Sequence, residues 1–203
     1  MPTIMEGLPG IFKNPSFINA LLNSIKLTFV NGIFGTLFGQ ILGYICAKGR
    51  GKLHGKLVEQ LVFIPYLIPS IAFGGIFLSM FSRPQMVFGI PLIPSLYGTF
   101  ALLTLTSVVK HLPFASRAGM ANMMQISGEL EEAANIEGAG FFRRFSRIVF
   151  PLSKGGFVSG FMLIFVSIMK ELDLIILIMT PKTATLPYLA FQYQNGNSPQ
   201  ASN

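Results

Sequence analysis

The sequence predicts an all-α membrane protein, a polytopic transmembrane helix bundle of about four spans. Of the 203 residues, 51% are hydrophobic and 11% are charged, whereas ordinary soluble domains carry about 25% charged residues. The mean hydropathy is +0.60. The apolar residues gather into runs long enough to cross the ~30 Å hydrocarbon core of a bilayer. The amino terminus lacks the basic head and continuous apolar core of a secretory signal, so insertion is expected to depend on the later spans.

Four apolar stretches are the predicted spans, and together with the loops they form one expected transmembrane domain over residues 1–203. Prolines 65 and 69 interrupt the second stretch and remove backbone donors, so we expect a kinked helix packed against protein. The third contains Lys110, His111 and Pro113 and is the least apolar. The predicted spans cover residues 27–47, 61–81, 95–124 and 155–180.

Small residues recur at helical spacing along the first span. Within an arc of ~100° a helix would gather six of them, leaving Phe29, Phe34 and Phe38 to other faces. Such a stripe allows two backbones to approach closely. Two interpretations stay open, packing inside one subunit and an interface or gate between subunits. The stripe consists of Thr28, Gly32, Gly35, Thr36, Gly39 and Gly43.

Basic residues gather in two loops, one after the first span and one before the fourth. Because cytoplasmic loops collect Lys and Arg, both loops are predicted to be cytoplasmic. The loop 82–94 carries only Arg83, and the tail after Thr180 carries only Lys182, so both are expected outside together with the two termini. The cytoplasmic basic residues are Lys48, Arg50, Lys52, Lys56, Arg143, Arg144, Arg147 and Lys154.

The composition argues against several function classes. The formal charge of +7 sits between apolar runs rather than on a folded polar face, so no nucleic-acid partner is expected. Cys46 is the single cysteine, which excludes an intrachain disulfide and favours a buried packing role. No metal, cofactor or catalytic site is predicted, because His54 and His111 lie far apart. The segment 51–57 (GKLHGKL) lacks the spacing of a phosphate-binding loop, so ATP is expected to bind a different chain.

A polar and small-residue insert over residues 126–154 separates the third and fourth spans. Glutamates at 129, 131 and 132 suit the first turn of a short helix, where carboxylates meet the positive end of the dipole. Gly138 and Gly140 then permit a reversal through positive φ. Phe141, Phe145 and Ile148 follow at helical spacing. The pattern predicts a short rigid element outside the bilayer.

This insert resembles the EAA motif of type I ABC importer permeases, the inner-membrane components of binding-protein-dependent transport systems. The motif consists of glutamate, two alanines, three residues, glycine, nine residues, isoleucine, two residues and proline, and the family commonly has leucine where this chain has Phe150. In that family the short helix inserts into a cleft on the ATPase. The implied coupling loop, residues 126–154, would therefore dock an ATPase through Glu132, Ala133, Ala134, Gly138, Ala139, Gly140, Ile148 and Pro151.

Similarity to the same family extends over roughly residues 14–190. It implies a multi-pass protein of the bacterial inner membrane, in contact with lipid. It also implies three kinds of protein partner: cytoplasmic ABC ATPase subunits, a second permease subunit or copy, and an extracytoplasmic solute-binding protein. Family cores carry a further span after the last external loop and often another before the first, so the sequence is expected to be an incomplete permease core.

Three charged residues interrupt the predicted fourth span. In a helix starting at residue 155, Lys170, Glu171 and Asp173 would lie about 22–27 Å along the axis, in the outer half of the membrane. Unpaired charges there cost ~2.5–3.5 kcal/mol each. One hypothesis pairs Lys170 with Asp173 within the helix. The other makes these residues candidates for the solute pathway, with Glu171 facing it or the partner subunit.

The segment 167–187 (SIMKELDLIILIMTPKTATLP) is similar to the corresponding part of ferric-iron permeases. Ferric iron is therefore the predicted substrate, with thiamine, aminoethylphosphonate and polyamine as alternatives of the same class. A membrane-embedded lipid-modifying enzyme, using His111 and the acids of the fourth span, and a purely structural membrane subunit are the alternatives of other classes.

Overall fold

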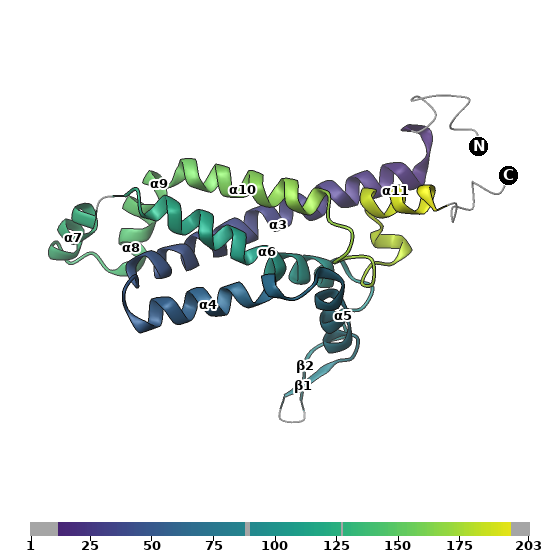
Figure 1. The fold of residues 1–203 in the computed structure, drawn as a ribbon, viewed down its shortest axis with the longest axis horizontal. Helices are drawn as coiled ribbons and strands as arrows, with labels where there is room; N and C mark the ends of the chain where they lie inside the picture. The colour runs from purple at the N-terminus through teal and green to yellow at the C-terminus, as the bar shows by residue number, and fades with distance from the viewer. Residues whose placement is uncertain (1–11, 88–89, 127, 196–203) are drawn as a thin grey trace. The chain divides into compact units, whose positions relative to one another are not determined.

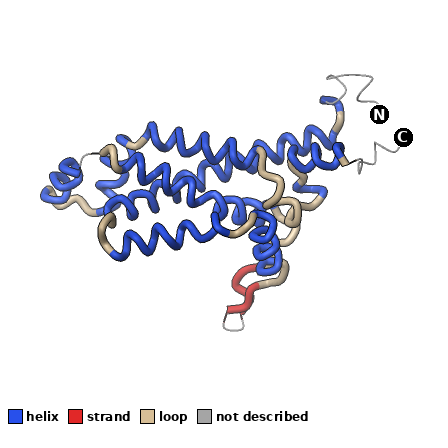
Figure 2. The backbone as a smooth tube through the Cα atoms, in the orientation of Figure 1, coloured by secondary structure: helices blue, strands red, loops and turns tan. Residues whose placement is uncertain are grey.

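The computed structural model describes residues 12–87, 90–126 and 128–195. These residues form two compact units. Unit 1 takes the described parts of Met1–Val30, Ile68–Ser107 and Val166–Asn203, and unit 2 takes those of Asn31–Leu67 and Val108–Phe165. Figures 1 and 2 show that most of the described chain is helical, as the sequence predicts. Three helices, α3, α6 and α10, contribute residues to both units.

Helix α3 (Pro15–Lys48) contains the first predicted span and begins twelve residues before it. Its 34 residues correspond to about 51 Å of helix, more than the hydrocarbon core requires. Among the described residues, α3 is the one single helix that is long and apolar enough to cross a membrane. Up to three crossings result when two bent helix pairs are each counted as one span.

The second predicted span is broken rather than merely kinked. It forms two helices, α4 (Leu53–Leu67) and α5 (Ser70–Phe81), with residues 68 and 69 between them. Proline at 69 disfavours helical backbone at the residue before it, and Pro69 itself is extended, with φ −52° and ψ 138°. The helix is therefore interrupted before Pro69 rather than kinked, and Pro65 stays inside α4.

An antiparallel hairpin follows α5 and falls in a loop for which no strand was predicted. It pairs β1 (Gln85–Val87) with β2 (Ile90–Ile93), and Figure 2 shows it in red beyond α5. Helix α6 (Phe100–Met123) then covers most of the third predicted span, 95–124. It is 24 residues long but is not apolar enough to count as a single spanning helix. Its polar residues include Lys110 and His111.

The expected coupling loop folds into short helical pieces. They are α7 (Gly128–Ile136), α8 (Phe141–Arg144), a π-helical turn η1 (Phe145–Val149) and α9 (Phe150–Leu152). Figure 1 shows α7 at the outer end of this loop.

The fourth predicted span, 155–180, is too long. Helix α10 (Lys154–Met169) ends eleven residues earlier, and turns lead to the 3₁₀ helix η2 (Pro181–Thr183) and to α11 (Leu186–Gln194). Leu174, Ile175 and Ile178 in these turns are at most 1% exposed. A methyl group at Gly74 of α5 would overlap the Leu174 carbonyl, so the segment packs closely against α5 within unit 1. Apolarity there reflects burial inside the protein rather than a membrane helix.

The glycines of the small-residue stripe of α3 pack against α6 and α10 within unit 2. A Cβ at Gly32 would come within 2.6 Å of the Phe161 ring of α10, and one at Gly43 would overlap the α6 backbone at Gly119. Gly39 likewise meets Ala115 of α6. Of the two interpretations left open, packing within one chain is thus the one observed for these glycines. The phenylalanines at 29, 34 and 38 lie on the other faces and are about half exposed.

Candidate functional site

Helix α7 holds the first half of the EAA-like motif. Glu132, Ala133 and Ala134 lie within it, as expected, and Glu129 stands in its first turn. Glu132 and Ala133 are exposed and Ala134 is half-buried. The hydrophobic side chain of Ile136 is 86% exposed at the helix end. An exposed apolar residue beside two small residues is a surface that a protein groove can cover.

A Schellman motif ends α7. The Gly138 N–H donates to the Asn135 carbonyl at 3.0 Å, and the Ala139 N–H donates to the Ala134 carbonyl at 2.9 Å. Gly138 has φ +74°, the left-handed conformation that glycine adopts without a Cβ penalty. The predicted reversal at Gly138 is confirmed.

Gly140 plays a different part from the one expected. Its φ is −64° and its ψ is 166°, so it caps the start of α8 in an extended conformation and does not use positive φ. A Cβ at either glycine would meet open space. The turn therefore depends on Gly138 for its backbone geometry, whereas Gly140 occupies a conformation open to any residue.

The second half of the motif lies in η1 and α9. The Phe150 N–H donates to the Phe145 carbonyl, which is the wide spacing of a π turn. Pro151 follows, cannot donate and would clash with the carbonyl four residues back in a regular α-helix. The wider turn accommodates that ring. Ile148 is half-buried in this segment and Pro151 is exposed.

Three aromatic rings anchor the loop to α3 inside unit 2. Tyr44 meets Phe141 edge-on at 5.6 Å and Phe145 at 5.8 Å between ring centroids. The rings of Phe141 and Phe145 stack at 6.0 Å. Val149 and Met123 complete a small buried cluster around Tyr44. Sequence reasoning predicted the spacing of the phenylalanines but missed Tyr44, whose only signal is a hydroxylated aromatic near the end of an apolar run.

The charged residues predicted inside the fourth span lie beyond α10. Because the α-helix ends at Met169, the intrahelical pair of Lys170 and Asp173 is wrong, and both side chains are exposed. Glu171 is half-buried and accepts a hydrogen bond from the Leu174 N–H at 3.2 Å. Its carboxylate thereby starts the turn that follows α10. Whether these residues face a solute pathway stays a prediction.

The ammonium group of the buried Lys110 side chain donates a hydrogen bond to a backbone carbonyl. Its Nζ donates to the Pro65 carbonyl at 2.9 Å, and the side chain is 8% exposed. In a continuous helix that carbonyl would accept from residue 69, which is proline and has no N–H.

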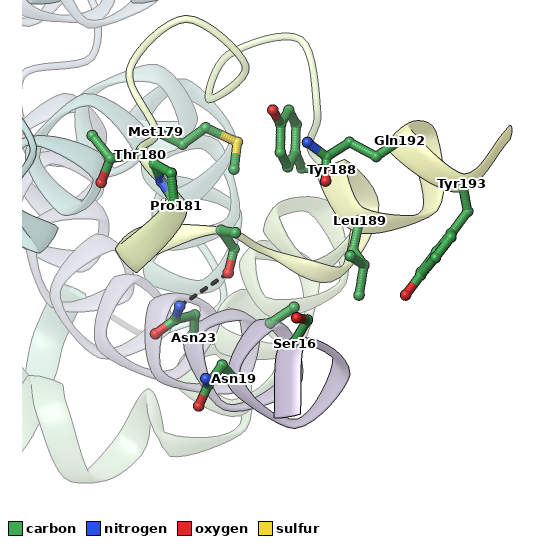
Figure 3. A pocket seen from close by; sticks show the side chains of 12 residues that line it. Ser16, Asn19, Asn23, Met179, Thr180, Pro181, Tyr188, Leu189, Gln192 and Tyr193 are labelled. Atoms are coloured by element: carbon green, nitrogen blue, oxygen red, sulfur yellow. Dashed lines mark hydrogen bonds between the residues drawn. The ribbon is translucent and has the colours of Figure 1, made fainter. Parts of the chain in front are cut away.

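A cavity of about 400 Å³ lies in unit 1 and is shown in Figure 3. Tyr188, Gln192 and Tyr193 of α11 line one side, and Ser16 and Asn19 of α3 line the other. Asn23 donates hydrogen bonds to the Lys182 and Ala184 carbonyls at 3.1 and 3.0 Å. That amide therefore holds the segment after α10 against α3.

These observations define a class: a helical membrane protein that presents a short helix and glycine turn outside its spans, fixed to them by aromatic packing. The chain belongs to the family described as "Binding-protein-dependent transport system inner membrane component", which matches residues 39–202. Members of this family are transport components rather than enzymes, so the lipid-modifying alternative is set aside.

Individual relatives agree on the class. The chain is 28% identical to the molybdate/tungstate transport system permease protein WtpB of Pyrococcus abyssi, over 93% of this chain and 71% of that protein. It is 29% identical to the sulfate transport system permease protein CysT of Synechocystis sp., over 88% of this chain and 61% of that protein. Other relatives are named as trehalose and ferric transport permeases.

The fold is also that of solved importers. A bacterial alginate ABC transporter, in complex with a periplasmic protein that holds an alginate pentasaccharide, matches with a TM-score of 0.74 and 19% identity. That likeness covers 93% of this chain and 70% of the solved one.

Proposed function

We propose that this chain is the permease subunit of an ATP-driven type I ABC importer. Its spans form part of the solute path, and its coupling loop receives the movement of cytoplasmic ATPase subunits. The observation that carries the proposal is the α7 to Gly138 turn, which holds the glutamate, the two alanines and the glycine of the EAA-like motif, with Ile136 86% exposed beside them. Such a surface suits insertion into a cleft of a soluble protein.

The partners follow from this assignment. Two ATPase subunits would bind the coupling loops of two permease chains, either two copies or a pair of different subunits. A solute-binding protein would deliver the substrate to the external side. The periplasmic protein in the alginate transporter complex supports this last partner.

The substrate is proposed to be a small inorganic ion. Ferric iron is the prediction from the segment 167–187, and a ferric permease of Actinobacillus pleuropneumoniae is 25% identical over 81% of this chain. A tetrahedral oxyanion is the second candidate, favoured by the molybdate/tungstate and sulfate permeases among the relatives. Trehalose permease similarity supports a sugar less well, because it is one protein among several ion permeases.

Co-purification with a cytoplasmic ABC ATPase from the same organism tests the function. The wild-type chain should retain the ATPase, and Gly138→Phe should release it, because a bulky side chain in the left-handed turn disturbs the surface. Gly51→Phe is the matched control: Gly51 also has positive φ and open space around it, but lies in the other predicted cytoplasmic loop. Retention by Gly138→Phe, or no retention by the wild type, would contradict the proposal.

The substrate is identified by measuring which ligand stabilises the solute-binding protein. Its melting temperature should rise with ferric ion or with one of molybdate, tungstate and sulfate, since a ligand that binds only the folded state stabilises it. A rise with trehalose alone would overturn the inorganic-ion proposal while leaving the transport function intact.

A further inference from the structure

One residue separates α9, the last helical piece before the fourth predicted span, from α10, and the chain bends there by 76°. Ser153 lies between α9 and α10 and has φ −87° and ψ 6°, outside the helical region. A single non-helical residue is the natural place for a helix pair to flex. We call this bend at Ser153 the elbow. A displacement of the coupling loop would change the angle of the elbow instead of moving α10, unless other contacts hold that angle fixed.

Asn122, near the end of α6, contacts the elbow from the side. Its Nδ2 donates to the Ser153 carbonyl at 3.0 Å. The same carbonyl accepts the Phe157 N–H of the first turn of α10 at 2.9 Å. Ser153 is fully buried, and its N–H donates to the Val149 carbonyl of η1 at 2.9 Å. One buried residue thus joins η1, α10 and α6 through hydrogen bonds.

Close packing keeps the Asn122 amide in place. A Cβ at Gly156 in α10 would overlap the amide atoms of Asn122, so glycine at 156 is required for the side chain to reach Ser153. The amide can donate to a carbonyl without carrying a charge. Aspartate would present only acceptors when ionised, and leucine would present neither donor nor acceptor.

We propose that Asn122 is a positioning residue for energy coupling: it locks the elbow at Ser153, so that α10 and α6 follow any displacement of the coupling loop. The inference rests on the proposed function only for the source of that displacement. The stiffness of the elbow is a property of this chain alone. It can therefore be measured with and without the ATPase.

Spin labels across the elbow measure its angle. Arg147 in η1 and Met162 in α10 are both exposed, and replacing each with cysteine gives a label pair in a Cys46→Ser background. The distance distribution is recorded for the whole chain in lipid nanodiscs. It is recorded again for the complex with its ATPase, without nucleotide and with ATP and vanadate.

The hydrogen bond from Asn122 to the Ser153 carbonyl is here called the clamp. Two variants remove it in different ways. Asn122→Leu removes the donor at similar size, and Gly156→Ala inserts a methyl group where the amide lies. Gln125→Leu is the matched control, because Gln125 is a neighbouring amide that lines the same cavity as Asn122. Co-purification with the ATPase shows that each variant still folds and assembles.

The wild type and Gln125→Leu should give one narrow distance that nucleotide leaves unchanged. Both clamp variants should broaden it, with about a fivefold larger population at other distances, as expected from the loss of one hydrogen bond of ordinary strength. A narrow distribution in both clamp variants, with and without nucleotide, would overturn the inference. A wild-type chain that captures no ATPase would instead contradict the proposed function, and the measurement without ATPase would still decide on the clamp.

Discussion

Glycine serves two opposite purposes in unit 2, one in the contact of α3 with α6 and one in the coupling loop. Gly43 of α3 is buried, and a methyl group on it would overlap the backbone of Gly119. Gly138 of the loop is exposed, with open space around it and φ +74°. Glycine is required at position 43 because neighbouring backbone leaves no room for a side chain, and at position 138 because its own φ is positive.

The difference shows how the chain combines a rigid part with a part shaped for contact. The α3–α6 contact has no room for adjustment, because the colliding atoms belong to backbone. The loop is held by aromatic edges around Tyr44 and leaves Ile136 and Phe142 more than four-fifths exposed. A fixed base with an exposed tip is what force transfer from another protein requires.

The largest effect is expected from Gly43→Val. The added side chain meets backbone that cannot move aside, so the variant should lose about 3 kcal/mol of stability and melt earlier in detergent. Gly35→Ala is the control, because its methyl would meet the flexible end of Ile164 at 3.1 Å. Equal melting temperatures for the two variants would contradict the claim that backbone atoms around Gly43 leave no room for a side chain.

Tyr44→Leu should come next, because it removes both aromatic edges that anchor the loop. Each such contact contributes ~0.5–1.5 kcal/mol beyond area burial, so amide hydrogen exchange over residues 141–149 should speed up markedly. Tyr44→Phe keeps the ring contacts with Phe141 and Phe145, so exchange should speed up less than in Tyr44→Leu. Unchanged exchange in Tyr44→Leu would show that the loop is anchored by other contacts.

Gly138→Ser tests the conformational role of glycine. A side chain in the left-handed region costs ~1–2 kcal/mol, which corresponds to about a 5–30-fold change in a local equilibrium. The Ala139 amide, which closes the turn onto Ala134, should therefore exchange faster by a factor of that size. Protection equal to that of the wild type would mean that the turn does not depend on glycine.

Gly140→Ser should have the smallest effect and the opposite sign. Gly140 already has the extended backbone of a helix N-cap, and a serine hydroxyl there can accept from the α8 backbone. A gain of a few tenths of a kcal/mol in the stability of α8 is expected from this cap, seen as slower amide exchange in the helix. A loss as large as that of Gly138→Ser would contradict the distinction between the two glycines.

The sequence was most informative where local chemistry decides the structure. The acidic start, the two alanines and the glycine predicted α7 and its positive-φ ending, because capping and turn geometry depend on residues close in the chain. The small-residue stripe of α3 likewise predicted a close helix contact, since glycine spacing reports the face that a neighbour approaches.

Predictions failed where hydropathy had to separate a membrane helix from a buried turn. Residues 174–178 are as apolar as a span, yet they pack against α5 after α10 has ended. Hydropathy measures the tendency to leave water and not the partner that receives the side chain. The links of Lys110 to Pro65 and of Asn122 to Ser153 join residues far apart in sequence, and no spacing rule reports them.

Site-specific crosslinking tests most directly whether the coupling loop is gripped by an ATPase. Ala133 is exposed on α7 and Val158 is exposed on α10, so each can be replaced with cysteine in a Cys46→Ser background. In membranes that contain both proteins, a short bifunctional reagent should join position 133 to the ATPase and leave position 158 unlinked. Linking from 158 and none from 133 would contradict the account.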